Sequence, residues 1–151
     1  MKSFAREEDR AELLARLRAV REDSQRRWGV MTAHQMVCHL GDAYLMMIGD
    51  RRASDATGLL QRTLIKWTAL YVPVYWPAGI LTRPELDQTA GGTKPGEFVA
   101  DVARVEALMQ RAAAAADCGT RPHPIFGGMS EAGWMRWAYL HMDHHLRQFG
   151  A

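Results

Sequence analysis

The sequence predicts an all-α fold, a four-helix bundle with one long crossover between its second and third helices. Four segments carry apolar residues at the three- and four-residue spacing of an amphipathic helix, and no segment alternates as a half-buried strand does. More than forty residues separate the second segment from the third, which is long for a connection within a bundle. The helices are expected at residues 4–21, 32–48, 97–116 and 130–149, within one domain that spans residues 1–151.

The first helix, residues 4–21, begins with an acidic cluster, which the helix dipole stabilises near a helix N-terminus. The second, residues 32–48, begins at Thr32. Thr32 and Gln35 have the spacing of a capping box, in which each side chain bonds a backbone N–H near the other residue. His39 lies at the edge of the apolar stripe of this helix, so it is expected to face the bundle interior.

The connection to the third helix is expected to hold a shorter helix over residues 58–71 and a turn-rich loop over residues 80–96. The third long helix, residues 97–116, keeps a near-heptad apolar spacing that suits a bundle. The fourth, residues 130–149, follows Ser130, a residue type favoured at helix N-caps. Helical bundles build metal sites between facing helices, so polar residues on inward stripes are the first candidates.

Two histidines of the fourth helix, His141 and His145, are four residues apart and therefore lie one turn apart on the same face. Two imidazoles so placed can share one metal ion, whereas His144 points away from this pair. If the second and fourth helices are neighbours, His39 completes a three-histidine site of the kind that binds catalytic zinc. The spacing leaves a second interpretation open, in which these imidazoles are hydrogen-bonded structural residues.

Asp42 and Gln148 are candidates for residues that orient the metal-binding imidazoles through hydrogen bonds. Asp42 is one turn from His39. It could instead be an additional metal ligand or a solvated surface charge. His34 is expected to be exposed near the start of its helix. His123 is expected to be a turn residue rather than part of a pocket mouth.

The net charge and the number of cysteines limit the expected partners and cellular location of the protein. The formal net charge is only +2, from 19 basic and 17 acidic residues, so no nucleic-acid partner is expected. Two cysteines are too few for a disulfide framework, which favours a cytoplasmic location; Cys38 is expected in the core, and Cys118 capped or exposed at a helix end. The N-terminal segment lacks the apolar core of a signal peptide.

The longest apolar run, residues 67–81, raises the question of a membrane. It is short for a membrane span, and Pro73 and Pro77 interrupt it, so no stable membrane insertion is expected. A buried helix end followed by irregular chain is the expectation, and contact with a membrane surface is an alternative.

Three stretches resemble the DinB/YfiT-like superfamily of metal-dependent helical-bundle proteins. The segment MTAHQMVCHLGDAY is similar to the second-helix segment of these proteins, with its histidine at His39. The segment HMDHHLRQ is similar to their HxxxH element and supplies His141 and His145. The chain from HPIFGG to its final HHLRQFG resembles a branch of this superfamily that is a domain of unknown function.

The resemblance implies an up-down-down-up bundle, a homodimer, and a divalent ion held by the three histidines. Zinc or nickel is the first expectation, with iron or manganese as alternatives. Better-known relatives are thiol-dependent transferases or isomerases, so a low-molecular-weight thiol or water is the implied group to be activated. The long middle segment and the HPIFGG loop depart from those relatives, so their reaction does not carry over.

These observations predict a metal-dependent enzyme, an S-transferase or a hydrolase, that acts on a small molecule of unknown identity. The alternative is a non-catalytic metal-binding or stress-related helical module.

Overall fold

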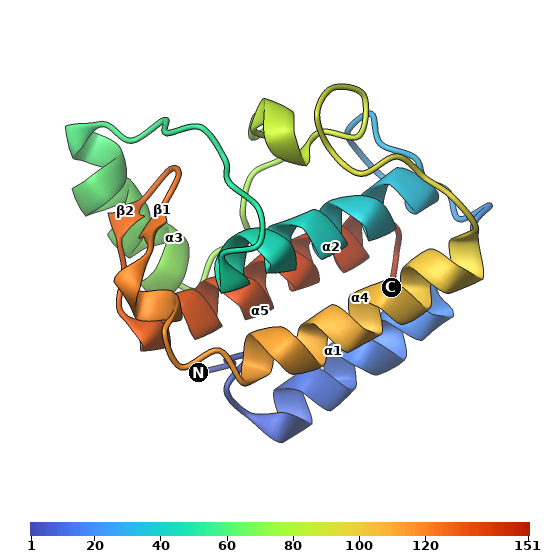
Figure 1. Ribbon diagram of the computed structural model, residues 1–151, viewed down its shortest axis with the longest axis horizontal. Coiled ribbons are helices and arrows are strands. Elements are labelled where there is room, and N and C mark those ends of the chain that lie inside the picture. The colour runs from blue at the N-terminus through green and yellow to red at the C-terminus, as the bar shows by residue number, and fades with distance from the viewer.

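Four long helices pack side by side around one hydrophobic core in the computed structural model, which describes residues 1–151 (Figure 1). They are α1 (Glu7–Ala19), α2 (Ala33–Ile48), α4 (Phe98–Ala113) and α5 (Glu131–Gln148). Helix α2 contacts both α4 and α5, and α1 contacts α5 and α4. The chain is therefore mostly helical, as the sequence predicts.

The helix ends follow local signals in the sequence. Thr32 and Gln35 form both bonds of the predicted capping box at the start of α2. The Ser130 side chain accepts a hydrogen bond from the Gly133 N–H at 3.1 Å, so the predicted N-cap of α5 is confirmed. Helix α2 ends at Gly49, whose φ of 91° is a left-handed conformation that glycine adopts without steric cost.

Four local expectations need correction. Helix α4 ends at Ala113 rather than at residue 116, and α1 covers a shorter range than residues 4–21. A two-stranded antiparallel ladder pairs β1 (Pro122–His123) with β2 (Gly127–Gly128), although no strand was expected. Strands of two residues are too short to show an alternating pattern. Cys118 is fully buried rather than exposed, because the short turn η3 (Cys118–Thr120) packs against α5.

The connection between α2 and α4 is helical over residues 59–71, where the sequence predicts a short helix over residues 58–71. The π-helical turn η1 (Gln61–Ile65) continues into α3 (Lys66–Tyr71), which contacts α5. The second half carries the short turn η2 (Pro84–Leu86), and this part of the chain passes over α2 (Figure 1). The long connection thereby places backbone groups of η2 beside α2.

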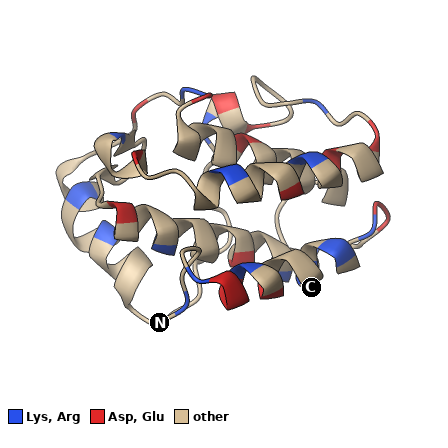
Figure 2. Ribbon diagram, turned by 60° about the horizontal axis from the view of Figure 1, so that its bottom comes forward, with Lys and Arg blue, Asp and Glu red and all other residues tan.

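Acidic and basic residues both occur along the long helices in the view of Figure 2. No helix has both the length and the apolar character required to cross a bilayer.

Candidate metal centre

Helices α2 and α5 bring His39, His141 and His145 together. Each imidazole offers one nitrogen to a group in which all these nitrogens lie within 4.8 Å of one another. Nε2 of His39 is 3.1 Å from Nε2 of His141, and the His145 ring centroid is 4.7 Å from each of the other two. His39 and His145 are buried, and His141 is partly exposed. We call these three residues the histidine site.

The long connection fixes the orientation of His39. Its Nδ1 lies 2.9 Å from the backbone carbonyl oxygen of Leu86, in η2. A carbonyl oxygen can only accept, so Nδ1 carries the proton and donates it. The Nε2 atom of His39 is then the unprotonated nitrogen, and its lone pair faces the other two rings.

A chain of hydrogen bonds fixes His145 in the same way. The Gln148 side-chain amide donates through Nε2 to the backbone carbonyl of Trp28 at 2.9 Å, which turns its Oε1 toward His145. The Oε1 atom lies 3.0 Å from Nδ1 of His145, so that nitrogen must be the donor. Nε2 of His145 is left unprotonated, with its lone pair free to act as an acceptor or a ligand.

Burial keeps these imidazoles neutral. It lowers the pKa of His39, although the hydrogen bond to Leu86 acts in the opposite direction. Burial also lowers the pKa of His141 and of His145 well below the ordinary value, and the neighbouring imidazoles lower both further. Neutral imidazole is the form of histidine that binds a metal ion.

Aromatic rings surround the exposed side of the histidine site. The Trp137 ring stacks on His141, with centroids 4.8 Å apart and planes at 19°. The ring centroid of Trp76, in the chain after α3, lies 6.4 Å from that of His141 and 6.1 Å from that of His144. His144 packs between Trp76 and Trp28 instead of joining the three histidines, as its place on the helix predicts.

Asp42 makes no hydrogen bond to a histidine. Its fully buried carboxylate accepts bonds from Gln88 Nε2 at 2.9 Å and from the Thr93 N–H and hydroxyl at 2.8 and 2.6 Å, and Arg51 lies 3.3 Å away. These residues belong to or hold the same loop whose Leu86 carbonyl reaches His39. Asp42 therefore anchors that loop to α2, and Gln148 alone of the two predicted orienting residues touches an imidazole directly.

A second group of metal-ligand residue types lies between α2 and α4: His34, Cys38 and Asp101, which we call the Asp101 cluster. His34 is buried, not exposed as expected, because its Nε2 lies 2.8 Å from the Asp101 carboxylate. The same carboxylate oxygen accepts bonds from the Gly96 N–H at 2.9 Å and the Cys38 thiol at 3.6 Å. Burial raises the pKa of Cys38 to about 12, and the nearby carboxylate of Asp101 adds to this, so the thiol stays protonated.

His123, expected to be a turn residue, is buried at the end of β1, directly before the turn at residues 124–126. Its Nδ1 accepts hydrogen bonds from the backbone N–H groups of Ile125 and Phe126 at 3.1 and 3.2 Å. Its ring packs against Trp134 and Trp137, and it also lines a small surface cavity that contains none of the three histidines. It is not part of the histidine site.

Two groups of the histidine site carry no signal in the sequence. The carbonyls of Leu86 and Trp28 are backbone atoms of irregular segments, and any residue type supplies the same acceptor. Trp76 is visible in the sequence, but its place beside His141 depends on the path of the long connection.

A sequence profile of a protein family described as "Protein of unknown function (DUF1569)" matches residues 8–151. Searches of curated proteins and of solved structures returned no match.

Proposed function

Since the chain belongs to the DUF1569 family, whose function is unknown, we propose its function from the geometry of the histidine site: it binds a divalent metal ion through His39, His141 and His145. We propose zinc or nickel as the ion, with iron or manganese as alternatives. The bound ion would activate a low-molecular-weight thiol or a water molecule, in an S-transferase or a hydrolase.

The observation that carries this proposal is the mismatch of donors and acceptors within the histidine site. The Nε2 atoms of His39 and His145 are both acceptors, because outer hydrogen bonds hold the proton of each ring on Nδ1. The remaining ring, His141, can donate its Nε2–H to only one of them. A structural network of histidines would alternate donors and acceptors. With the proton of His141 on its Nδ1, all three rings would turn a lone pair toward a shared cation.

The protein's own residues preorganise this site. Leu86 and Gln148 hold two rings in the required tautomer, as partners of metal-binding histidines commonly do. Asp42 fixes the loop that carries Leu86. Trp137 and Trp76 limit the access of water beside His141, the partly exposed ligand. A divalent ion bound there would lower the pKa of a coordinated thiol or water.

We also propose that the chain shares the up-down-down-up bundle of the DinB-like superfamily and forms a homodimer. The HxxxH pair on the last helix, His39 on α2 and the long connection before α4 support the shared topology. Light scattering coupled to gel filtration measures the mass in solution. A monomeric mass at all protein concentrations would refute the proposed homodimer.

One observation favours a non-catalytic metal-binding module as the second candidate. The cavity between α3 and the start of α5, and the cavity beside His123, are lined by residues other than the three histidines. A buried metal that no substrate reaches would serve structure alone. A catalytic metal must exchange its bound water or thiol with solvent, whereas a purely structural metal need not, so this exchange distinguishes the two functions.

The first test is metal content by elemental mass spectrometry, on protein purified without an affinity tag. We expect near-stoichiometric divalent metal in the wild type and its loss in His145→Ala, with His144→Ala as the matched control on the adjacent position. Protein that folds and stays metal-free after reconstitution would refute the site. If metal is bound, the wild type is assayed for thiol transfer and hydrolysis, and inactivity on both would favour the non-catalytic module.

A further inference from the structure

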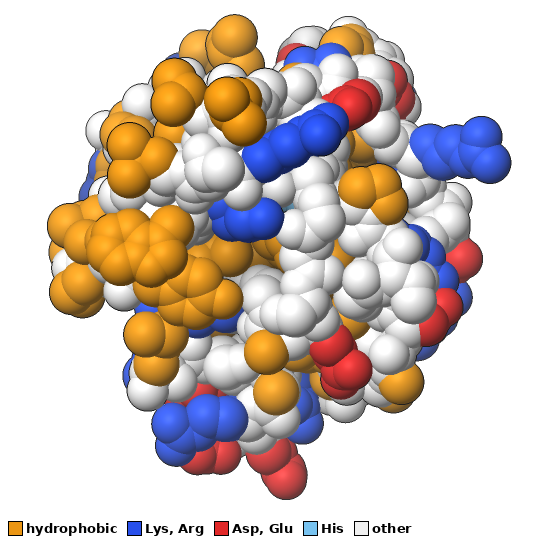
Figure 3. All heavy atoms as spheres, turned by 90° about the vertical axis from the view of Figure 1, so that its left-hand side faces the viewer, with side chains coloured by type: hydrophobic (Ala, Val, Ile, Leu, Met, Phe, Trp, Pro, Cys, Tyr) orange, Lys and Arg blue, Asp and Glu red, His pale blue; other side chains and the backbone are white.

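The helical segment 59–71 and the chain that follows it expose large apolar side chains that the histidine site does not use. Leu60 and Leu64 are each 62% exposed, Trp67 58% and Tyr75 74%. We call this surface the apolar face; its members are Leu60, Leu64, Trp67, Tyr71, Val74 and Tyr75. Figure 3 shows hydrophobic side chains gathered on the side of the molecule that carries α3.

Helix α3 has more apolar surface than its contacts with the chain bury. Leu70 is its only buried residue, and Ala69 packs beside the core. An apolar stripe along one face of a helix normally packs against another surface, with polar residues on the opposite face. Contiguous apolar surface on a soluble protein marks a binding surface more often than a neutral one. The apolar face therefore lacks a partner within the chain.

The charged side chains within the segment that carries this face have one sign. Residues 56–84 include Arg62, Lys66 and Arg83 and contain no aspartate or glutamate. Arg147, at the end of α5, lies 3.3 Å from the centroid of the Tyr75 ring. The nearest acids in sequence are engaged locally: the Thr57 N–H donates to Asp55 at 2.8 Å, and the Ser54 hydroxyl donates to Glu85 at 3.1 Å.

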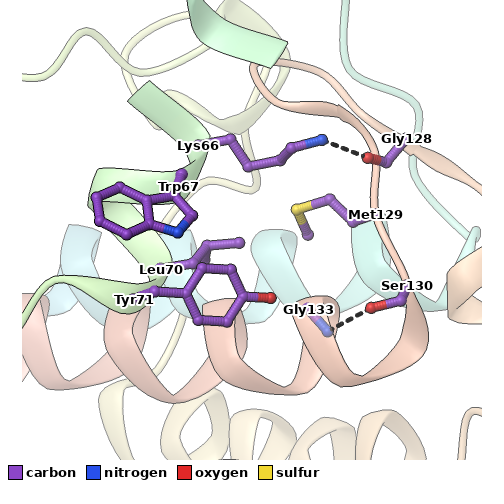
Figure 4. Close-up of a pocket in the computed structure, with 8 residues that line it drawn as sticks. All are labelled: Lys66, Trp67, Leu70, Tyr71, Gly128, Met129, Ser130 and Gly133. Atoms are coloured by element: carbon purple, nitrogen blue, oxygen red, sulfur yellow. Dashed lines mark hydrogen bonds between the residues drawn. The ribbon is translucent and has the colours of Figure 1, made fainter. Parts of the chain in front are cut away.

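A hollow of about 230 Å³ extends the apolar face inward, between α3 and the start of α5. Figure 4 shows Trp67, Leu70 and Tyr71 on one side of it and Met129 on the other, with Lys66 bonded to the Gly128 carbonyl at 2.8 Å. Aromatic rings with a polar edge and lysines with long apolar stems are the side chains that settle at a membrane–water boundary.

We propose that the apolar face binds the surface of an anionic lipid bilayer. Apolar and aromatic side chains enter the boundary between head groups and acyl chains, and the guanidinium groups of Arg62 and Arg147 lie at the level of the lipid phosphates. Attachment is peripheral, because no helix of the protein can span a bilayer.

Charge complementarity favours this partner over a second copy of the chain. In a two-fold dimer the same patch meets itself. The apolar face would then bring cations against cations, with no carboxylate among residues 56–84 to pair with them. An anionic lipid surface offers the opposite charge over the whole patch.

Vesicle flotation tests the proposal with the full-length protein, using vesicles of phosphatidylcholine alone and of phosphatidylcholine with phosphatidylserine. We expect the wild type to float with the anionic vesicles only, and less at high salt, because salt screens the cationic contribution. Trp67→Glu should weaken binding about tenfold, because it places a negative charge on the apolar face. The matched control is Val99→Glu, since Val99 is 71% exposed on α4, away from this face.

Three results would overturn the proposal: no flotation with anionic vesicles, equal loss in the Val99→Glu control, or a dimer that Trp67→Glu dissociates without any vesicle binding by the wild type. The last result would assign the face to a second copy. Circular dichroism confirms that the variants fold. The proposal does not rest on metal binding, so His145→Ala is expected to float as the wild type does.

Discussion

Helix α2 contributes to two buried groups of metal-ligand residue types, and the two differ in how their atoms are partnered. In the Asp101 cluster one carboxylate oxygen accepts from an imidazole, a thiol and a backbone N–H, so donors and acceptor match. In the histidine site two acceptor nitrogens face a third ring that can satisfy only one of them. The difference teaches that proximity of ligand types alone does not indicate a metal site. The balance of donors and acceptors separates a structural network from a cation site.

The largest expected effect compares two histidines of the same helix. His39→Ala should abolish stoichiometric metal binding, because it removes one of three ligands. His34→Ala should leave the metal content unchanged, because the Asp101 cluster is satisfied without an ion. Elemental analysis of both variants, each checked by circular dichroism, measures the contrast. Equal metal loss in both variants would break the distinction between the two groups.

A smaller effect is expected from Gln148, which fixes the tautomer of His145. Gln148→Ala should lower metal affinity by about 10- to 100-fold, the usual effect of removing a partner of a metal-binding histidine. Gln148→Glu keeps an acceptor for Nδ1 of His145 and should recover part of the loss. Competition with a chromophoric chelator measures both affinities. If Gln148→Ala bound metal as tightly as the wild type, the outer hydrogen bonds would not preorganise the site.

The Asp101 cluster should respond in stability instead. Although burial acts to raise the pKa of Asp101, the hydrogen bonds from Gly96 and His34 lower it overall, so the carboxylate is ionised. His34→Ala removes one of its donors and should cost on the order of 2 kcal/mol of unfolding free energy. Cys38→Ala removes only a weak thiol donor and should cost less.

Urea unfolding of the metal-free proteins, followed by circular dichroism, measures these two costs. A larger cost for Cys38→Ala than for His34→Ala would show that packing, not the hydrogen bond to Asp101, holds this part of α2 against α4.

The sequence predicts the parts of this molecule that local chemistry determines. The capping residues Thr32 and Ser130 mark helix starts because their bonds are made within four residues. The pairing of His141 with His145 follows from the helix repeat alone. The meeting of both with His39 depends on which helices are neighbours, and the sequence supplied that only as an expectation.

The sequence predicts less where the partner is distant or is a backbone group. His34 was expected to be exposed because it lies in the first turn of a helix, yet Asp101, 67 residues away, buries it. Asp42 is a candidate partner for the imidazole one turn away, with an additional ligand and a solvated charge as alternatives, but its acceptor oxygens bind a loop some fifty residues later in the chain. Cys118 gave no sign of burial because η3 is a single turn held by contacts with α5. Such contacts depend on the path of the long connection and the order of helices, which spacing does not encode.

His123 offers a third comparison, a buried imidazole with neither a carboxylate nor other histidines as partners. Its Nδ1 accepts two backbone N–H groups, so the proton lies on Nε2, which has no acceptor and faces aromatic rings. Burial lowers its pKa to about 3, against about 6.5 in an unfolded chain. Between these values the unfolded chain binds the proton and the folded chain does not. His123 therefore costs stability as the pH falls from 6.5 toward 3.

His123→Asn isolates this contribution, because an asparagine oxygen can accept the same turn N–H groups and does not titrate. The wild type should lose about 1.4 kcal/mol more unfolding free energy per pH unit below 6.5 than the variant does. Urea unfolding at several pH values, on metal-free protein, measures the two slopes, and the other buried histidines contribute equally to both. Equal slopes would mean that His123 takes up its proton in the folded state, at the expense of the Ile125 and Phe126 hydrogen bonds. A hydrogen-bonded Nδ1 would then be insufficient to hold a buried imidazole neutral. The neutral rings of the histidine site are assigned from the same kind of bond, to Leu86 and Gln148. That assignment would therefore be weakened as well.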